Sequence, residues 1–148
     1  YHDVPGMRAD GTIDGDFFIC YLIQLQKLSE VCHRTHVIPL VIGRILGNLP
    51  ERADYPPDLM CELIELFNND DVDSEIGCCL SNRRGMSSRS PYAGGDIERS
   101  HIETFKKYRQ KAMIRSPRLA KILESEISSF EYMAAKEDER GKLADLNY

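Results

Sequence analysis

Apolar residues recur at spacings of three and four along most of the chain, which is the pattern of helices that bury one face. The first such segment covers 17–32, and Asp14 or Asp16 can accept hydrogen bonds from its first turn. Its apolar positions are Phe18, Tyr21, Leu22, Leu25, Leu28 and Cys32. A second segment covers 37–49, with Pro39 in its first turn, where a missing N–H costs nothing. β-Branched residues make a strand the alternative there, but the period is closer to about 3.6 than to about 2, so we expect a helix.

Further helical segments follow, separated by polar and turn-forming residues. The pattern predicts a third helix, which Pro56-Pro57-Asp58 begins and the polar run 68–71 ends. The segment 74–80 predicts one or two helical turns. The stretch 81–95 is rich in turn formers and has no period, so we expect one long loop there. Loops of that length are usually functional or disordered.

Two long helices are predicted for the C-terminal part. Asp96 begins the first, and at Ser116-Pro117 a capping Ser and a first-turn Pro begin the second. Because the junction between them is short, we expect an antiparallel hairpin, and the polar tail 136–148 is expected to fray. The sequence thus predicts an all-α protein of about five helices, an orthogonal or antiparallel bundle with this C-terminal hairpin and one long loop.

Length and composition fit one globular domain. The chain has 148 residues, 42% hydrophobic and 29% charged, which is enough apolar material for a core and too much for a disordered tail. We expect 1–148 to be a single helical domain and, because it begins with Tyr1, a fragment or C-terminal part of a longer protein. The net charge of -5 argues against an extensive nucleic-acid surface but leaves a local basic patch open.

Signals for export or membrane insertion are missing from the sequence. No charged and apolar leader is visible, and the longest apolar run is far shorter than a membrane span. We therefore expect a cytoplasmic protein that does not bind a membrane. The five cysteines are odd in number and contain no CxxC pair, so neither a disulfide framework nor a zinc ribbon is indicated. A reducing compartment is the simplest interpretation.

Two segments resemble metal sites without completing one. Residues 10–14 resemble the middle of an EF-hand calcium loop, but Phe17 stands where the bidentate Glu belongs. A turn followed by a helix cap is the preferred interpretation. Cys32, His33 and His36 bring metal-binding residue types close together, yet basic residues at a helix C-terminus also serve to meet the helix dipole. We expect no metal and no other cofactor.

The segment 77–95 contains no acidic residue and three arginines. Together with a helix start at Gly95 they suit an anion, since backbone N–H groups and guanidinium groups both bind phosphate or carboxylate. The alternative is that the arginines pair with the acidic run 70–75 or with Glu98 and only pin the loop. The three arginines are Arg83, Arg84 and Arg89.

A second cluster of positive charge lies in the first C-terminal helix and just beyond it. Lys107, Lys111, Arg115 and Arg118 are four, four and three residues apart, so they share a face if one helix continues through them. Such a stripe can follow a nucleic-acid backbone. Few aromatic residues accompany it, and a solvated face that balances the acidic tail is the preferred interpretation.

Short motifs are spread over most of the chain. They are Asp10-Gly11, Ile42-Gly43-x-Ile45-Leu46, Pro56-Pro57, Asn82-x-Arg84-Gly85, Gly94-Gly95-x-x-Glu98-Arg99, Ser116-Pro117-Arg118-x-Ala120 and Tyr132-x-x-Ala135-x-Glu137-Asp138. In these motifs the chain resembles the C-terminal helical region of larger uncharacterised bacterial proteins. The resemblance implies a bacterial, intracellular, helical module within a longer protein, and it implies no catalytic residues. It favours Arg84, Gly95, Glu98 and Arg99 as residues that matter for loop geometry or for binding.

These features leave three functional hypotheses. Because no catalytic constellation is complete, the first is a non-catalytic interaction or assembly module that binds a protein partner or the remainder of its parent chain. The second is binding of an anion or nucleic acid through the Arg-rich loop and the basic helix face. The third is an enzyme that uses Glu98, His101 and the arginines on an acidic or phosphorylated substrate. The candidate binding residues are Arg83, Arg84, Arg89, Gly95, Glu98, Arg99, Lys107 and Lys111.

Overall fold

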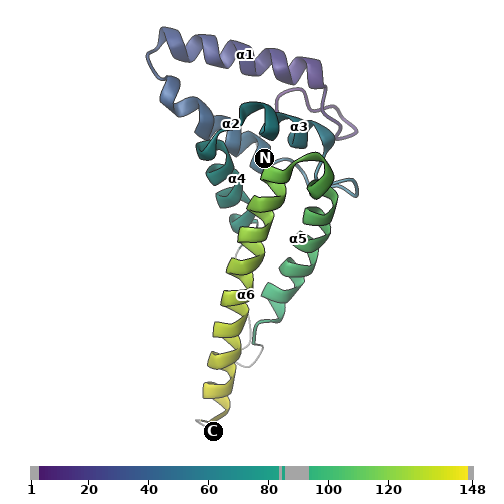
Figure 1. Cartoon of the computed structure of the whole chain (residues 1–148), viewed down its shortest axis with the longest axis vertical. Helices are drawn as coiled ribbons and strands as arrows, with labels where there is room; N and C mark the ends of the chain where they lie inside the picture. The colour runs from purple at the N-terminus through teal and green to yellow at the C-terminus, as the bar shows by residue number, and fades with distance from the viewer. Residues whose placement is uncertain (1–3, 84, 86–93, 147–148) are drawn as a thin grey trace.

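The computed structural model describes residues 4–83, 85 and 94–146, and every regular element within them is a helix (Figure 1). The elements are α1 (Gly15–Val31), the 3-10 helix η1 (Thr35–Val37), α2 (Ile38–Gly47), α3 (Asp58–Phe67), α4 (Asp70–Asn82), α5 (Asp96–Arg115) and α6 (Pro117–Leu146). The all-α class is confirmed, with six α-helices in this part of the chain rather than about five. The strand considered for 37–49 is wrong, because most of that segment is helical.

The boundary between α3 and α4 differs from the sequence prediction. Asn68 ends α3 in the left-handed conformation (φ 43°), and the side chain of Asn69 accepts hydrogen bonds from the N–H groups of Asp71 (2.9 Å) and Val72 (3.2 Å). The acidic residues that follow lie in the first turn of α4, where carboxylates are favoured by the helix dipole. The run 68–71 therefore joins two helices, and the second is longer than the predicted 74–80.

The polar tail continues α6 instead of fraying directly after Ala135. Asp138 accepts a hydrogen bond from the N–H of Gly95 (2.9 Å) and pairs with Arg99, so the tail is tied to the start of α5. In the same turn, Arg140 pairs with Glu137 at 2.9 Å. The contacts of Asp138 join segments that are far apart in the sequence, and local polarity alone does not reveal them.

α5 and α6 run antiparallel and lie side by side over most of the length of α5 (Figure 1). Three contacts show the register: Arg109 pairs with Glu124 at 2.6 Å, the rings of Phe105 and Phe130 lie 5.5 Å apart, and Arg99 pairs with Asp138.

Ser116 forms the junction between these two helices. Its buried hydroxyl accepts a hydrogen bond from Leu119 N–H (3.2 Å) and donates one to Glu65 of α3 (2.8 Å), which also accepts from Arg118 N–H (2.9 Å). A carboxylate at this position also meets the positive end of the α6 dipole. The helix start predicted from Ser116-Pro117 is thus completed by a side chain from another helix.

α2 and α4 approach each other closely through two glycines on one face of α2. A Cβ atom at Gly43 would lie 2.7 Å from the carbonyl oxygen of Val72, and one at Gly47 would lie 2.6 Å from Cβ of Cys79. The contact therefore requires residues without a side chain at both positions.

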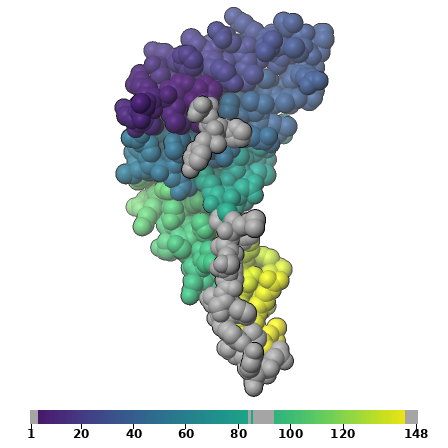
Figure 2. All heavy atoms as spheres, turned by 180° about the vertical axis from the view of Figure 1, so that it is seen from behind, coloured from purple at the N-terminus to yellow at the C-terminus, as the bar shows by residue number. Residues whose placement is uncertain are grey.

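The core is shared by all of the α-helices, and α1 contributes few residues to it for its length of 17 residues. α1 lies across one end of the molecule, opposite the C-terminal end of α6 (Figure 1), and Phe18 and Leu22 are its buried apolar residues. Seen from behind, the N-terminal third of the chain gathers at that end (Figure 2). Among the described residues, no helix combines the length and the apolar character needed to cross a membrane.

Candidate functional site

Two turn-forming carboxylates precede and cap α1. Asp14 accepts a hydrogen bond from Phe17 N–H (3.0 Å) and pairs with Arg8 (2.9 Å), and these interactions, in that order, lower the pKa of Asp14. The Asp10 carboxylate accepts bonds from the hydroxyl and the N–H of Thr12, at 2.6 and 2.9 Å. The predicted turn and helix cap are therefore confirmed, with Asp14 as the capping residue.

Most of the circumference of α1 faces solvent, although much of it is apolar. The exposed apolar and thiol side chains are Phe17, Ile19, Cys20, Ile23, Leu28 and Val31. Leu28 is 60% exposed and Val31 is 77% exposed. A helix that is apolar on several sides is typical of one that packs against more than one surface, and clustered exposed apolar residues mark interaction sites.

One line of residues along α1 forms a surface that we call the outer stripe. Its members are Phe17, Cys20, Gln24, Leu28 and Val31. At 3.6 residues per turn these five positions fall within about 80° of the helix circumference. Asp16 lies at the first turn, whereas Lys27 and Arg34 lie toward and just beyond the last. Within the described part of the chain, none of these three charged side chains has an ion-pair partner.

Cys32, His33 and His36, the metal-binding residue types noted in the sequence, follow directly after α1. His33 lies in the turn that ends the helix, with a φ of 55°, and His36 lies in η1. In the ranges that the structure describes, no three His, Cys, Asp or Glu side chains are grouped so that they could hold a metal ion.

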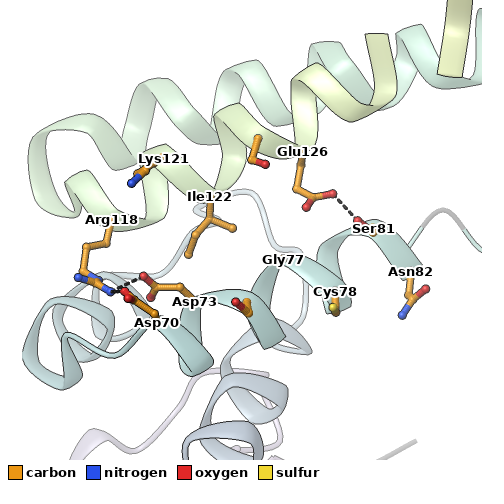
Figure 3. Close-up of a pocket in the computed structure, with 12 residues that line it drawn as sticks. Asp70, Asp73, Gly77, Cys78, Ser81, Asn82, Arg118, Lys121, Ile122 and Glu126 are labelled. Carbon is orange, nitrogen blue, oxygen red and sulfur yellow. Dashed lines mark hydrogen bonds and ion pairs between the residues drawn. The ribbon is translucent and has the colours of Figure 1, made fainter. Parts of the chain in front are cut away.

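A cleft of about 560 Å³ lies between α4 and the first half of α6 (Figure 3). At one end Arg118 pairs with Asp73 (2.6 Å) and Asp70 (2.8 Å), and the hydrogen bonds that its guanidinium group donates to these carboxylates, in that order, raise the pKa of Arg118. At the other end the buried carboxyl of Glu126 accepts a hydrogen bond from the hydroxyl of Ser81. Burial raises the pKa of Glu126 above its ordinary value, while the bond from Ser81 lowers it in part.

These charged groups of the cleft mostly bind one another. Arg118 also donates to Asn68, so both of its terminal nitrogens are engaged. Among the described residues that line the cleft there is no histidine to stand as an imidazole base beside the exposed thiol of Cys78. The cleft has the form of a polar groove between helices.

Arg83 is the first of the predicted anion-binding residues, and it pins the end of α4. Its guanidinium group binds the carboxylate of Glu51 (2.6 Å) and the carbonyl oxygens of Gly47 and Leu49 (2.7 Å each). It also lies 4.9 Å from the ring centroid of Tyr55. Its carboxylate partner therefore comes from the segment after α2 and not from the acidic run 70–75. Arg84 and Arg89 lie outside the described residues.

The helix start at Gly95 does bind a carboxylate, and that carboxylate belongs to the same chain. The N–H of Gly95 donates to Asp138, and Arg99 binds both Asp138 and Asp96. The bond from Gly95, with the charge of Arg99 beside it, lowers the pKa of Asp138. Glu98 is completely buried within α5. The anion predicted for this helix start is thus supplied from 43 residues further along the chain.

The basic residues of α5 do not form one continuous face with Arg118. α5 ends at Arg115, which pairs with Asp58, and Arg118 belongs to the next helix. The ammonium group of Lys111 donates to the carbonyl oxygens of Ala53 (2.9 Å) and Tyr55 (3.4 Å). Lys107 is exposed.

His101 of the enzyme hypothesis is half-buried, and its ring stacks on Phe130 with 5.3 Å between centroids. It borders a second cleft of about 480 Å³, together with Arg83 and Thr104.

Comparison of the chain with protein-family models, with curated proteins and with solved structures finds no match.

Proposed function

We propose that this chain is a non-catalytic helical module that mediates association with another protein chain through the exposed face of α1. The observation that supports the proposal is the exposure of large apolar side chains on this helix, above all Leu28 and Val31. Fully burying a side chain of this kind contributes roughly 1.5–3 kcal/mol, and in water that contribution is not realised. An association that covers this face of α1 would bury these side chains and gain that free energy.

The anion-binding alternative has less support from the described residues. Arg83, Arg99 and Lys111 each bind acceptors within the chain, so recruiting them for a phosphate requires these bonds to be broken. The net charge of -5 also disfavours approach of a polyanion.

Thiol labelling in cells tests the proposed function. All five cysteines are free, which fits the reducing compartment that we propose for the module. Cys20 lies on the outer stripe, and Cys78 is exposed on α4. The alkylation rate of each thiol is measured by mass spectrometry in cells that naturally produce the protein and in dilute purified protein.

If another chain covers this face of α1 in cells, Cys20 should react at least about tenfold more slowly there than in dilute solution, because the bound chain excludes the alkylating reagent. Cys78 provides the control for reagent concentration, and its rate should be similar in both settings. Equal in-cell and dilute rates for Cys20, after this correction, would contradict the proposed function.

A further inference from the structure

We infer that the partner of the outer stripe is the same stripe of a second copy of this chain, with the two α1 helices antiparallel. This inference rests on the proposed function and names the partner for it. Three properties of the described residues support it: the spacing of the stripe, the matching of side-chain sizes and the distribution of charge.

The spacing of the outer stripe is the same when read from either end. Its five positions are separated by three, four, four and three residues, with Gln24 at the centre. A two-fold axis through Gln24 therefore places each stripe position opposite another stripe position of the second copy. Phe17 then faces Val31, Cys20 faces Leu28, and Gln24 faces its own equivalent. Self-complementarity of this kind is what a two-fold homodimer interface requires.

The facing side chains also match in size and chemistry. The largest apolar side chain of the stripe, Phe17, meets the smaller Val31, and the small Cys20 meets Leu28. Large side chains opposite small ones let two helices interdigitate without voids or clashes. At the axis the carboxamide of Gln24 offers both donors and an acceptor, so two copies can bind each other. A single polar pair in an apolar seam selects one register over the alternatives.

Charge favours the antiparallel direction. The N-terminal end of α1 carries Asp16, whereas toward and just beyond the C-terminal end Lys27 and Arg34 outnumber the one acidic residue, Glu30, so that this end is net basic. An antiparallel pair places each acidic end near the basic end of the second copy, whereas a parallel pair places like charges together. The helix dipoles are also opposed in this arrangement.

The expected dimer is weak. A helix of 17 residues is about 25 Å long, and two such helices bury only a small interface. Interfaces below about 1,200 Å² in total are characteristic of weak and transient complexes, so we expect a dissociation constant in the micromolar range.

Sedimentation equilibrium of the purified chain over about 1 μM to 1 mM tests the inference. The mass should rise from that of one chain to that of two. Leu28→Glu and Val31→Glu should each weaken the dimer at least about tenfold, because they place a charge in the apolar seam. Ile19→Glu is the matched control, since it adds the same charge to an exposed apolar position of α1 outside the stripe. Thermal unfolding by circular dichroism verifies that each variant folds.

The register is tested by cross-linking. In a background with Cys20→Ser, Cys32→Ser and Cys78→Ser, Gln24→Cys should form a covalent dimer with a short bis-maleimide, because the axis places the two thiols together. Ile23→Cys in the same background is the control and should form little.

The outcomes separate this inference from the proposed function. A chain that stays monomeric over the whole range, or equal loss with Ile19→Glu and Leu28→Glu, overturns the second copy as partner. If Cys20 is nevertheless protected in cells, the proposed function stands with a different partner. If Cys20 is unprotected as well, both fail.

Discussion

Glu126 is a carboxyl group that the fold removes from water, with the hydroxyl of Ser81 as its hydrogen-bond donor. Burial disfavours its charged form, and the pKa of Glu126 is therefore raised above its ordinary value of 4.5. The folded chain holds this proton more tightly than the unfolded chain does. The stability that the proton contributes is fully present below the unfolded pKa and is lost as the pH rises through the folded pKa.

Glu126→Gln should accordingly stabilise the protein at neutral pH, because the amide has nearly the same shape and no charge to desolvate. The gain should shrink as the pH falls, because the wild-type carboxyl of the folded chain becomes protonated at a pH above its ordinary pKa of 4.5. Urea unfolding at several pH values between about 4 and 8 measures the free energy of unfolding for both proteins.

Glu131→Gln removes one charge from an exposed position of the same helix and serves as the control. A gain that is equal for the two variants would show that the effect comes from net charge and not from burial of Glu126. A loss of stability in Glu126→Gln at neutral pH would contradict the assigned direction.

At the scale of elements, the contact between α2 and α4 depends on the absence of two side chains. Gly43 and Gly47 lie one helical turn apart and face the backbone or Cβ atoms of α4. An Ala at either position would improve helix propensity by up to about 1 kcal/mol. It would also force the helices apart, because the atoms that it would meet belong to the backbone or to the base of a side chain.

Gly43→Ala should therefore destabilise the protein by about 1–3 kcal/mol, the usual cost of overpacking. Gly15→Ala is the matched control: its Cβ would lie 3.8 Å from Leu59, an ordinary contact, so its effect should be small or stabilising. Denaturant unfolding compares the two variants. A neutral or stabilising effect of Gly43→Ala would show that propensity outweighs the close approach.

At the scale of the whole molecule, the proposed interaction surface and the α4–α6 cleft are separate. α1 lies across one end, and the α5–α6 hairpin extends away from it (Figure 1). Pairing through the outer stripe therefore leaves the cleft of each copy accessible. Residues of the cleft and of the stripe should act independently, because distant sites without shared partners have additive effects.

This separation predicts that Glu126→Gln leaves the dissociation constant of the dimer unchanged within about twofold, the additivity expected for distant sites. Leu28→Glu should raise it at least about tenfold, since it places a charge in the seam. Sedimentation equilibrium on the two variants measures both values. A comparable loss of dimer with Glu126→Gln would place the interface at the cleft instead.

The local features of the fold could be predicted from the sequence because they depend on neighbours within a few residues. Helical periodicity identifies α1 and α2, and capping chemistry places helix starts at Asp14 and Ser116. The α3–α4 boundary was not predicted, because Asn68 and Asn69 signal the end of one helix and the start of the next equally well.

Candidate binding residues were harder to assign, because the partners that decide their roles are distant in the sequence. Arg83 pairs with Glu51, and Gly95 binds Asp138. An arginine has the same local pattern whether it binds a ligand or a carboxylate of its own chain. Only the fold shows which of these the described residues do.

Residue spacing and helix caps are enough to show that the chain is helical and which faces of its helices are apolar. Which of these apolar faces are covered follows only from the packing of the folded chain. Leu28 belongs to the predicted apolar pattern of the first helix, yet the fold leaves it in solvent beside Val31. The reason is geometric: periodicity states where a helix is apolar, whereas burial depends on which distant segment packs there.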